Sequence, residues 1–535
     1  MATTIKIDPV TRIEGHLAVD VEVEAGKVVR AHSSGEMFRG FEVILAGRDP
    51  LDAQQITQRI CGICPISHAT AAVLALDQAF GIVPPDNGRL LRNLLLGANF
   101  IQSHLTHFYH LSALDFVDVK AVANYTGSDR VLQGVKAWVA EQVESRAIHP
   151  AAPLLPGYNG TYLSNSEGNM LVVRHYVDAL SMRRLAHKMG ALFGGRLPHA
   201  SAIVPGGVTQ DITATNVTAC GSMLRELRRF IDRAYIPDVV AVGKAFGDYF
   251  ALGAGCGNFL SYGVFPETAD GAKRLLGCGV LHGGKRARFD PAKISEDVRY
   301  SRFAAPSGLH PTKGRTTPEP TKAGAYSWIK APRYDGHVME VGPLARIMVA
   351  YHAGNKAVRS LVDRTVADMG VKVGDMVSVM GRHAARAIEC KLVADACVRW
   401  LAALRPGTPD ARPKPPKRDK DGKPIRPDTP EALKPDRANR PTCTRFRIPE
   451  RGAGVGLTEA PRGALGHWLT ITDQKIAAYQ CVVPTTWNCS PRDDKGRPGA
   501  VEQALVGTPI ADPAHPLEAA RVVRSFDPCL ACAVH

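Results

Sequence analysis

The sequence predicts an α+β fold that is mainly α-helical, with a central helix bundle and short peripheral antiparallel sheets. Long stretches in which apolar residues recur with helical spacing predict the bundle. Alternation of apolar and polar residues near the N-terminus, and a glycine-rich, strand-like segment, predict the sheets. The helical stretches lie near 88–117, 131–147, 168–193, 212–250 and 342–401, and the strand-like segment covers 255–340. With 535 residues, 45% hydrophobic and 22% charged, the chain has the composition of a globular protein with a sizeable core. We expect a single domain spanning 1–535.

The first elements follow from local patterns. Residues 3–31 alternate apolar and polar side chains and turn at Ala25-Gly26-Lys27, which predicts a β-hairpin. Ala69 to Phe80 is expected to form a helix that ends at Gly81.

Residues 405–445 differ from the rest of the chain. This segment holds ten prolines and twice as many basic as acidic residues, without apolar periodicity. It is expected to be an extended surface insert. Much of the net charge of +15 lies here and aromatic residues are only 6%, so the charge does not indicate a nucleic-acid-binding protein. No apolar run is long enough to span a membrane.

Two Cys-x-x-Cys pairs stand near opposite ends of the chain: Cys61 with Cys64, and Cys529 with Cys532. Two cysteines three apart project their sulfurs to one side, and two facing pairs form a four-thiolate site for a soft metal. Pro65 and Asp527-Pro528 mark helix starts, with Asp527 as N-cap, where the helix dipole lowers a thiol pKa. Spacing alone leaves open a structural zinc ion or two unrelated redox pairs.

Three further residues are candidates for the site because they lie in short glycine-containing motifs or next to a cysteine pair. Glu14 lies in Thr11-Arg12-Ile13-Glu14-Gly15-His16, and Glu42 ends Gly35-Glu36-Met37-Phe38-Arg39-Gly40-Phe41-Glu42. His68 falls one turn after Cys64, where its ring could donate to a thiolate. A surface ion pair for Glu14 and a core position for His68 are the plainer interpretations.

Together these segments resemble the large, catalytic subunit of nickel–iron hydrogenases. The segments that carry the resemblance occur in the family's order: Arg12–His16, Gly35–Glu42, Arg59–His68, Tyr326–Arg333, Glu340–Arg346, Glu459–Trp468 and Asp527–His535. The match runs through the chain except for 405–445. A single segment is weak evidence for the family, but all of them in this order are specific to it. A structural zinc ion is therefore no longer the favoured interpretation of the cysteine pairs.

The resemblance implies a Ni-Fe(CN)2(CO) centre. Cys61 and Cys529 would be terminal nickel ligands, while Cys64 and Cys532 would bridge nickel to an iron carrying one CO and two cyanides. Residues near the centre would be Arg462 and Thr485, which hydrogen-bond the cyanides, the apolar wall of Leu465, Val483 and Pro484, and His68 beside a thiolate. Glu42, the carbonyl of Cys481 and His535 would hold Mg²⁺ or a similar divalent ion.

The implied reaction is heterolytic cleavage of H2. Either the Cys529 thiolate or the Arg462 guanidine would be the first base, and the sequence does not choose between them. Glu14 would accept the proton from Cys529 and pass it outward. The resemblance is incomplete at Ser103, where many members of the family have an Asp near Arg462. A hydroxyl cannot supply that negative charge, so the pKa or position of Arg462 is expected to differ.

The resemblance also implies partners. An iron–sulfur small subunit would receive the electrons, in a heterodimer or a dimer of heterodimers. Nickel-insertion proteins and a protease that removes an extension after His535 would mature the chain. An H2-sensing relative and a metal-free structural protein of the respiratory-complex type are the alternatives, and the four cysteines speak against the second. The start of the sequence has no signal-like apolar run, so we expect a cytoplasmic protein, although export together with the small subunit would also fit.

Overall fold

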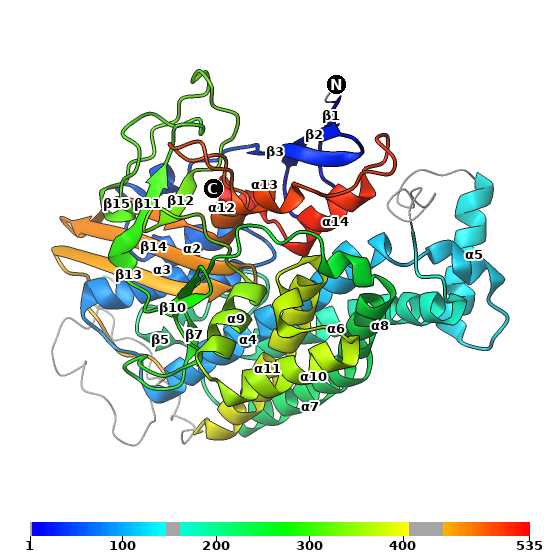
Figure 1. The fold of residues 1–535 in the computed structure, drawn as a ribbon. Coiled ribbons are helices and arrows are strands. Elements are labelled where there is room, and N and C mark those ends of the chain that lie inside the picture. Colours follow the sequence, from blue (N-terminus) through cyan, green and yellow to red (C-terminus); the bar gives the residue numbers. More distant parts are fainter. Residues whose placement is uncertain (1–2, 146–160, 406–441) are drawn as a thin grey trace.

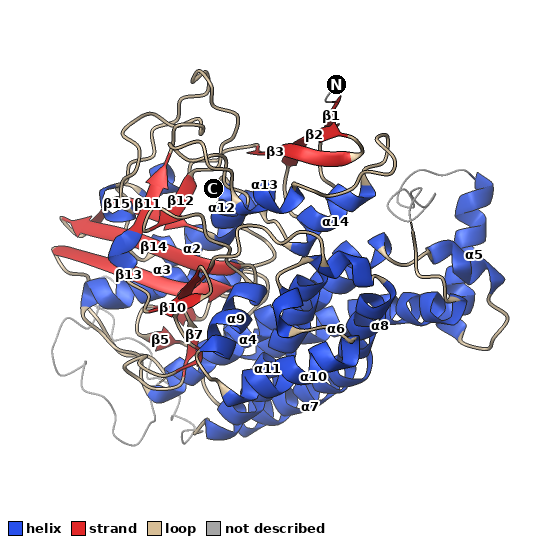
Figure 2. Ribbon diagram, viewed as in Figure 1, coloured by secondary structure: helices blue, strands red, loops and turns tan. Residues whose placement is uncertain are grey.

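The computed structural model describes residues 3–145, 161–405 and 442–535. Helices gather in one half of the molecule, and small sheets with the C-terminal segment form the other half (Figures 1 and 2). This arrangement confirms the predicted α+β class. The main helices are α4 (Asp86–Thr106), α6 (Ser166–Gly194), α7 (Ala214–Phe230), α8 (Ile236–Ala245), α9 (Pro343–His352), α10 (Lys356–Met369) and α11 (Val379–Ala403).

The predicted helical stretches are broken where the backbone demands it. The stretch 342–401 forms three helices, because Gly370 ends α10 in the left-handed conformation and a turn at Gly354 separates α9 from α10. The stretch 212–250 is interrupted by a π-helical turn over Ile231–Tyr235, between α7 and α8. The segment near 131–147 forms α5 (Arg130–Ser145), which lies at one end of the molecule (Figure 1).

The N-terminal hairpin is confirmed and gains a third strand. Strands β1 (Thr3–Ile7), β2 (Leu17–Glu24) and β3 (Lys27–Gly35) form an antiparallel sheet in the order β1-β2-β3, with Glu24 opposite Lys27 at the turn. The strand-like region 255–340 forms two short antiparallel pairs and one small three-stranded antiparallel sheet. Its strands are β6 (Phe259–Ser261), β7 (Val264–Pro266), β8 (Arg274–Leu276), β9 (Gly279–His282), β10 (Lys285–Ala287), β11 (Ile294–Asp297) and β12 (Ala331–Tyr334), preceded by the pair β4 (Ile203–Val204) and β5 (Gly207–Val208).

Helix α3 (Pro65–Phe80) packs unusually close to the sheet of β13 (Arg451–Ala460), β14 (Gly463–Thr472) and β15 (Lys475–Val482). A Cβ atom at Gly454 would lie 1.8 Å from the carbonyl oxygen of Ala75, and one at Gly456 would lie 1.9 Å from that of Ala71. Glycines at alternate strand positions therefore meet carbonyls one helical turn apart. This contact sets the N-terminal end of α3, and Cys64 with it, against the sheet.

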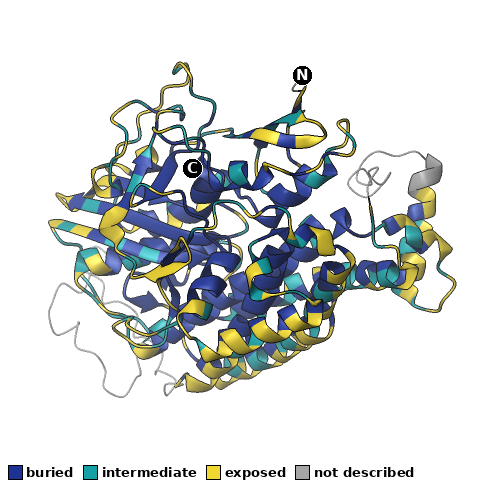
Figure 3. Cartoon of the chain, viewed as in Figure 1, coloured by how far each residue is buried: buried dark blue, intermediate teal, exposed yellow. Residues whose placement is uncertain are grey.

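The C-terminal segment lies inside the protein (Figure 3). The carbonyl of His535 accepts a hydrogen bond from the N–H of Phe41 at 3.0 Å, and Glu14 pairs with Cys529 through a parallel β-bridge. The remaining helices of this half are α1 (Phe41–Leu45), α2 (Asp52–Thr57), α12 (Pro484–Asn488), α13 (Ala500–Leu505), α14 (Leu517–Ser525) and α15 (Leu530–Ala533).

Most of the predicted insert 405–445 lies outside the described residues, which resume at Thr442. The single-domain organisation with a surface insert therefore stays a prediction. Within the described ranges, every helix is too short or too polar to cross a bilayer.

Candidate metal centre

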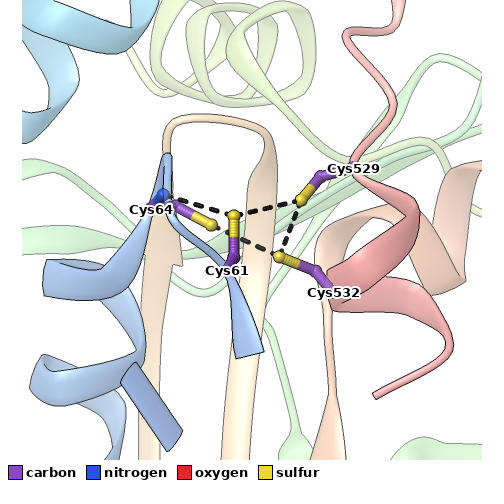
Figure 4. A group of neighbouring side chains, drawn as sticks. All are labelled: Cys61, Cys64, Cys529 and Cys532. Atoms are coloured by element: carbon purple, nitrogen blue, oxygen red, sulfur yellow. Dashed lines mark hydrogen bonds between the residues drawn. The ribbon is translucent and has the colours of Figure 1, made fainter. Parts of the chain in front are cut away.

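The two cysteine pairs meet in the interior. Cys61 and Cys64 come from the start of α3, and Cys529 and Cys532 come from the start of α15 (Figure 4). The Sγ atoms of Cys61 and Cys529 are 3.3 Å apart, as are those of Cys64 and Cys532, and Cys529 and Cys532 are 2.9 Å apart. All four sulfurs lie within 4.8 Å of one another and all four residues are buried. The structure therefore brings the first and last cysteine pairs together, as predicted.

Each pair sits at a helix N-terminus, although one predicted cap is wrong. Cys64 caps α3 and Pro65 is its first residue, as expected. At the second pair the cap is Cys529 rather than Asp527. Asp527 has a left-handed φ of 56°, and its carboxylate binds Arg462 instead of the α15 N–H groups. The demand of a buried guanidinium for a counter-charge outweighs the local capping preference.

The ionisation of the four thiols fits a cation among them. Hydrogen bonds from Cys529, Cys532 and Cys64 lower the pKa of Cys61 well below its usual value. Burial raises the pKa of Cys529 and Cys532 well above theirs. Without a cation, the cluster therefore does not carry four negative charges in an interior of low dielectric. Metal ions supply the positive charge that four thiolates need, and sulfur donors select soft metals.

Glu14 lies against one of these thiols. Its Oε2 is 3.1 Å from the Sγ of Cys529 and accepts a hydrogen bond from the N–H of Ala531 at 2.9 Å. The backbone holds it from both sides, since its N–H donates to Pro528 and its carbonyl accepts from Leu530. Burial, and next the charge of Cys61, raise the pKa of Glu14. The side chain is half-buried, so it joins the cluster to the outside.

Arg462 is buried beside the cysteines. Its carboxylate partner is Asp527, which the sequence analysis assigned to helix capping. Its Nη2 donates to Asp527 at 2.8 Å, while Ser103 Oγ lies 3.4 Å from Nη1. Asp527 therefore supplies a buried counter-charge to Arg462, while Ser103 offers only a hydroxyl. Burial acts to lower the pKa of Arg462, but the charges of Asp527 and Cys529 outweigh it and raise that pKa. Its buried Nε has no hydrogen-bond partner among the described residues, so one donor remains for a ligand at the cluster.

His68 lies where the sequence analysis expected it. Its Nε2 is 3.5 Å from the Sγ of Cys532, and its Nδ1 is 3.2 Å from Nε2 of His467. His467 in turn contacts the hydroxyl of Tyr479 at 2.8 Å. His467 and Tyr479 were not singled out from the sequence, although His467 lies within the motif Glu459–Trp468. Burial lowers the pKa of His68 to about 4, so its ring is neutral at pH 7.

The remaining predicted residues are Thr485, which contacts the backbone of Cys529, and three apolar residues. Thr485 Oγ1 accepts the N–H of Cys529 at 2.9 Å, and a hydroxyl that accepts can still donate its own hydrogen. The predicted apolar wall residues are all buried: Leu465, Val483 and Pro484. They come from β14 and from the start of α12.

A second group of potential ligands contains Glu42, Cys481 and His535. One ligand atom from each, including the Cys481 thiol, lies within 4.8 Å of the others. Glu42 is near Nε2 of His535 at 3.2 Å and accepts the N–H of Cys481 at 2.6 Å. Lys330, which the sequence analysis did not identify, lies 3.3 Å from Glu42. Burial opposes ionisation of Glu42, but the charge of Lys330 and the hydrogen bond and charge of His535 outweigh it and lower its pKa.

Comparison with known proteins agrees with this geometry. The family described as nickel-dependent hydrogenase matches residues 39–414 and 430–535, and a HoxL-like family matches residues 4–34. The chain is 41% identical to the periplasmic NiFeSe hydrogenase large subunit of Desulfomicrobium baculatum, over 99% of this chain and 94% of that protein. It is 38% identical to the uptake hydrogenase large subunit of Rhizobium leguminosarum bv. viciae, over 99% and 95%.

Solved structures agree as well. The as-isolated oxidised Ni-Fe-Se hydrogenase from D. vulgaris Hildenborough matches with a TM-score of 0.83 and 42% identity, covering 100% of both chains. The NiFeSe hydrogenase of Dm. baculatum matches with a TM-score of 0.81 and 40% identity, also covering 100% of both.

The comparisons correct the expected compartment. The prediction of a cytoplasmic protein is wrong, because similar large subunits are named as periplasmic and uptake hydrogenases. The absence of a signal-like run in this chain was the basis for that prediction, and it does not decide the location of a protein with such relatives. The sulfur cluster, the helix-rich fold and the matches over nearly the whole chain show that the protein belongs to the nickel-dependent hydrogenase family, as a large subunit of an oxidoreductase that acts on H2.

Proposed function

We propose that this chain is the catalytic subunit of a hydrogenase that cleaves H2 heterolytically at a Ni-Fe(CN)2(CO) centre. Cys61 and Cys529 would bind nickel terminally, and Cys64 and Cys532 would bridge to iron. The observation that carries the proposal is the buried group of four sulfurs within 4.8 Å of one another. When bound, the centre supplies the cleavage of H2 into protons and electrons.

The protein's own residues then move the proton. The Sγ of Cys529 accepts it, and the Oε2 of Glu14 lies 3.1 Å away, within direct hydrogen-bond reach. The hydrogen bond from Ala531 N–H fixes the carboxylate in this position. Because Glu14 is half-buried, it can pass the proton on toward solvent.

Arg462 acts as a donor and positioning group in this proposal. The raised pKa of Arg462 keeps its guanidinium protonated, which favours Cys529 over Arg462 as the first proton acceptor. With Nη2 held by Asp527, the free Nε and the hydroxyl of Thr485 would donate to the cyanides. The buried side chains of Leu465, Val483 and Pro484 would keep water from the diatomic ligands.

The second group would hold a divalent cation, Mg²⁺ or a similar ion. Glu42 supplies a carboxylate, His535 supplies a ring nitrogen, and Cys481 would contribute its carbonyl. A hard cation prefers such oxygen donors over the Cys481 thiol. Burial keeps the Cys481 thiol protonated, since its pKa is raised well above the usual value.

The electrons would leave through an iron–sulfur small subunit in a heterodimer. Support comes from the relatives, several of which are named as the large subunit or large chain of a hydrogenase. We therefore expect the active protein to be purified with a second polypeptide.

Metal analysis and infrared spectroscopy of the purified heterodimer test the proposal. The expected result is nickel and iron in comparable amounts, CO and cyanide bands, and H2-dependent reduction of a dye. Zinc in place of nickel, or a spectrum without these bands, would overturn it. Dye reduction also separates a catalytic enzyme from an H2 sensor, in which turnover would be slow.

A further inference from the structure

Two histidines meet on the surface of the protein, outside the metal centre. His282 is the last residue of β9, and His337 lies three residues after the end of β12. Their ring centroids are 4.1 Å apart, and both residues are exposed. The other histidine pairs in ring contact within the described ranges, His68 with His467 and His107 with His383, are buried.

Each of the two imidazoles is presented by a tight two-residue turn. His282 stands opposite Lys285 across Gly283-Gly284, whose φ angles are 55° and 76°. His337 stands opposite Tyr334 across Asp335 and Gly336, whose φ angles are 51° and 72°. Positive φ at both central positions is the signature of the type I′ hairpin turn, which fits the twist of the flanking strands.

Backbone hydrogen bonds fix the second turn further. The N–H of Tyr334 donates to His337 at 3.0 Å, and the N–H of His337 donates back to Tyr334 at 2.9 Å. The two rings therefore stand side by side on short, hydrogen-bonded supports. A site whose ligands are held in place before binding loses less conformational entropy when the ion arrives.

The surroundings of His337 favour its neutral ring, which offers a lone pair to a metal ion. Desolvation by neighbouring atoms, and next the charges of His282 and Arg497, lower the pKa of His337. The carboxylate of Asp335, in the turn that presents His337, is engaged in an exposed ion pair with Lys293 at 2.8 Å, which holds its pKa below the usual value.

We propose that His282 and His337 chelate one divalent transition-metal cation of the Ni²⁺, Cu²⁺ or Zn²⁺ type. Imidazole nitrogen is the donor that these ions share. With metal–nitrogen distances of about 2.1 Å, two imidazoles on one ion have ring centres about 4.5–5 Å apart. The observed 4.1 Å needs only small side-chain rotations to reach that separation. The site is separate from the buried thiols and does not depend on the reaction proposed for them.

Binding of Ni²⁺ to the purified, fully loaded heterodimer tests this inference. In equilibrium dialysis we expect one additional Ni²⁺ per chain, and His282→Ala or His337→Ala should each weaken this binding by roughly tenfold or more. His352→Ala, at another exposed histidine, is the matched control and should leave the affinity unchanged. Dye reduction by all three variants should equal that of the parent protein, which confirms their folding.

Two results would overturn the inference. The first is the absence of an additional Ni²⁺ per chain in the parent protein. The second is binding that persists at full affinity in both His282→Ala and His337→Ala.

Discussion

Replacement of Glu14 by Gln gives the sharpest test of the proposed proton route. Glutamine has nearly the same shape, and its side-chain oxygen can still accept the N–H of Ala531, which now binds Glu14 at 2.9 Å. Both backbone contacts of residue 14, with Pro528 and Leu530, remain. An amide, however, does not take up a proton from Cys529 near neutral pH. The substitution therefore removes the transfer and leaves the geometry.

The expected loss follows from the contacts of the thiol. Among described residues, Glu14 contributes the one oxygen within hydrogen-bond distance of Cys529 Sγ, whose other neighbours are the sulfurs of the cluster. Loss of a positioned proton acceptor lowers turnover by about 10²–10⁴-fold, which corresponds to about 3–5 kcal/mol in the activation barrier.

Stability should not fall in this variant. The folded-state pKa of Glu14 is raised, chiefly by burial, so the folded protein binds the proton more tightly than the unfolded chain. The ionised carboxylate therefore costs stability at neutral pH, and stability falls as pH rises from the unfolded pKa through the folded one. A neutral amide removes that cost.

H2-dependent dye reduction, measured beside nickel content, is the assay. Glu24→Gln, an exposed position at the end of β2, is the matched control and should keep full activity. A Glu14→Gln protein with full nickel and near-normal turnover would refute the proton route through Glu14.

Three further predictions concern the surroundings of the site. Asp527→Asn leaves the buried Arg462 without its counter-charge, so we expect about 3–5 kcal/mol of lost stability, measured by chemical denaturation; an unchanged midpoint would contradict this. Cys64→Ser should abolish nickel and iron loading, whereas Cys489→Ser, at a buried thiol outside the cluster, should retain both metals by elemental analysis. Burial raises the pKa of Glu502 to about 7, so its contribution to stability is lost as pH rises from about 4.5 to 7. In Glu502→Gln the thermal midpoint should vary less between pH 5 and pH 8 than in the parent protein, and an equal slope would count against the raised pKa.

Local sequence patterns predicted the elements whose structure depends mainly on neighbouring residues. Alternation placed the N-terminal hairpin, and the Pro65 and Gly81 signals placed both ends of α3. Residue 527 shows the limit of such reasoning. Asp before Pro is a capping signal, yet the carboxylate binds Arg462, from a segment 65 positions away in the sequence. The buried guanidinium needs that charge more than α15 needs a cap.

Other members of the site carry no local signal. Lys330 reaches Glu42 across 288 positions, and His467 reaches His68 across 399. A lysine or histidine in either segment has the same appearance in sequence whether it faces water or a buried partner. Only the packing of the elements around it decides which partner it meets.

Each Cys-x-x-Cys pair presents two sulfurs from one turn because residues three apart lie on the same side of a helix start, and this follows from the spacing of the residues. That the two pairs meet follows only from the packing of distant elements. Gly454 and Gly456 admit the backbone of α3 to the sheet, and the bridge from Glu14 to Cys529 draws the C-terminus inward. Helical spacing is set by backbone geometry within a few residues, whereas contact between distant segments depends on close packing of whole elements.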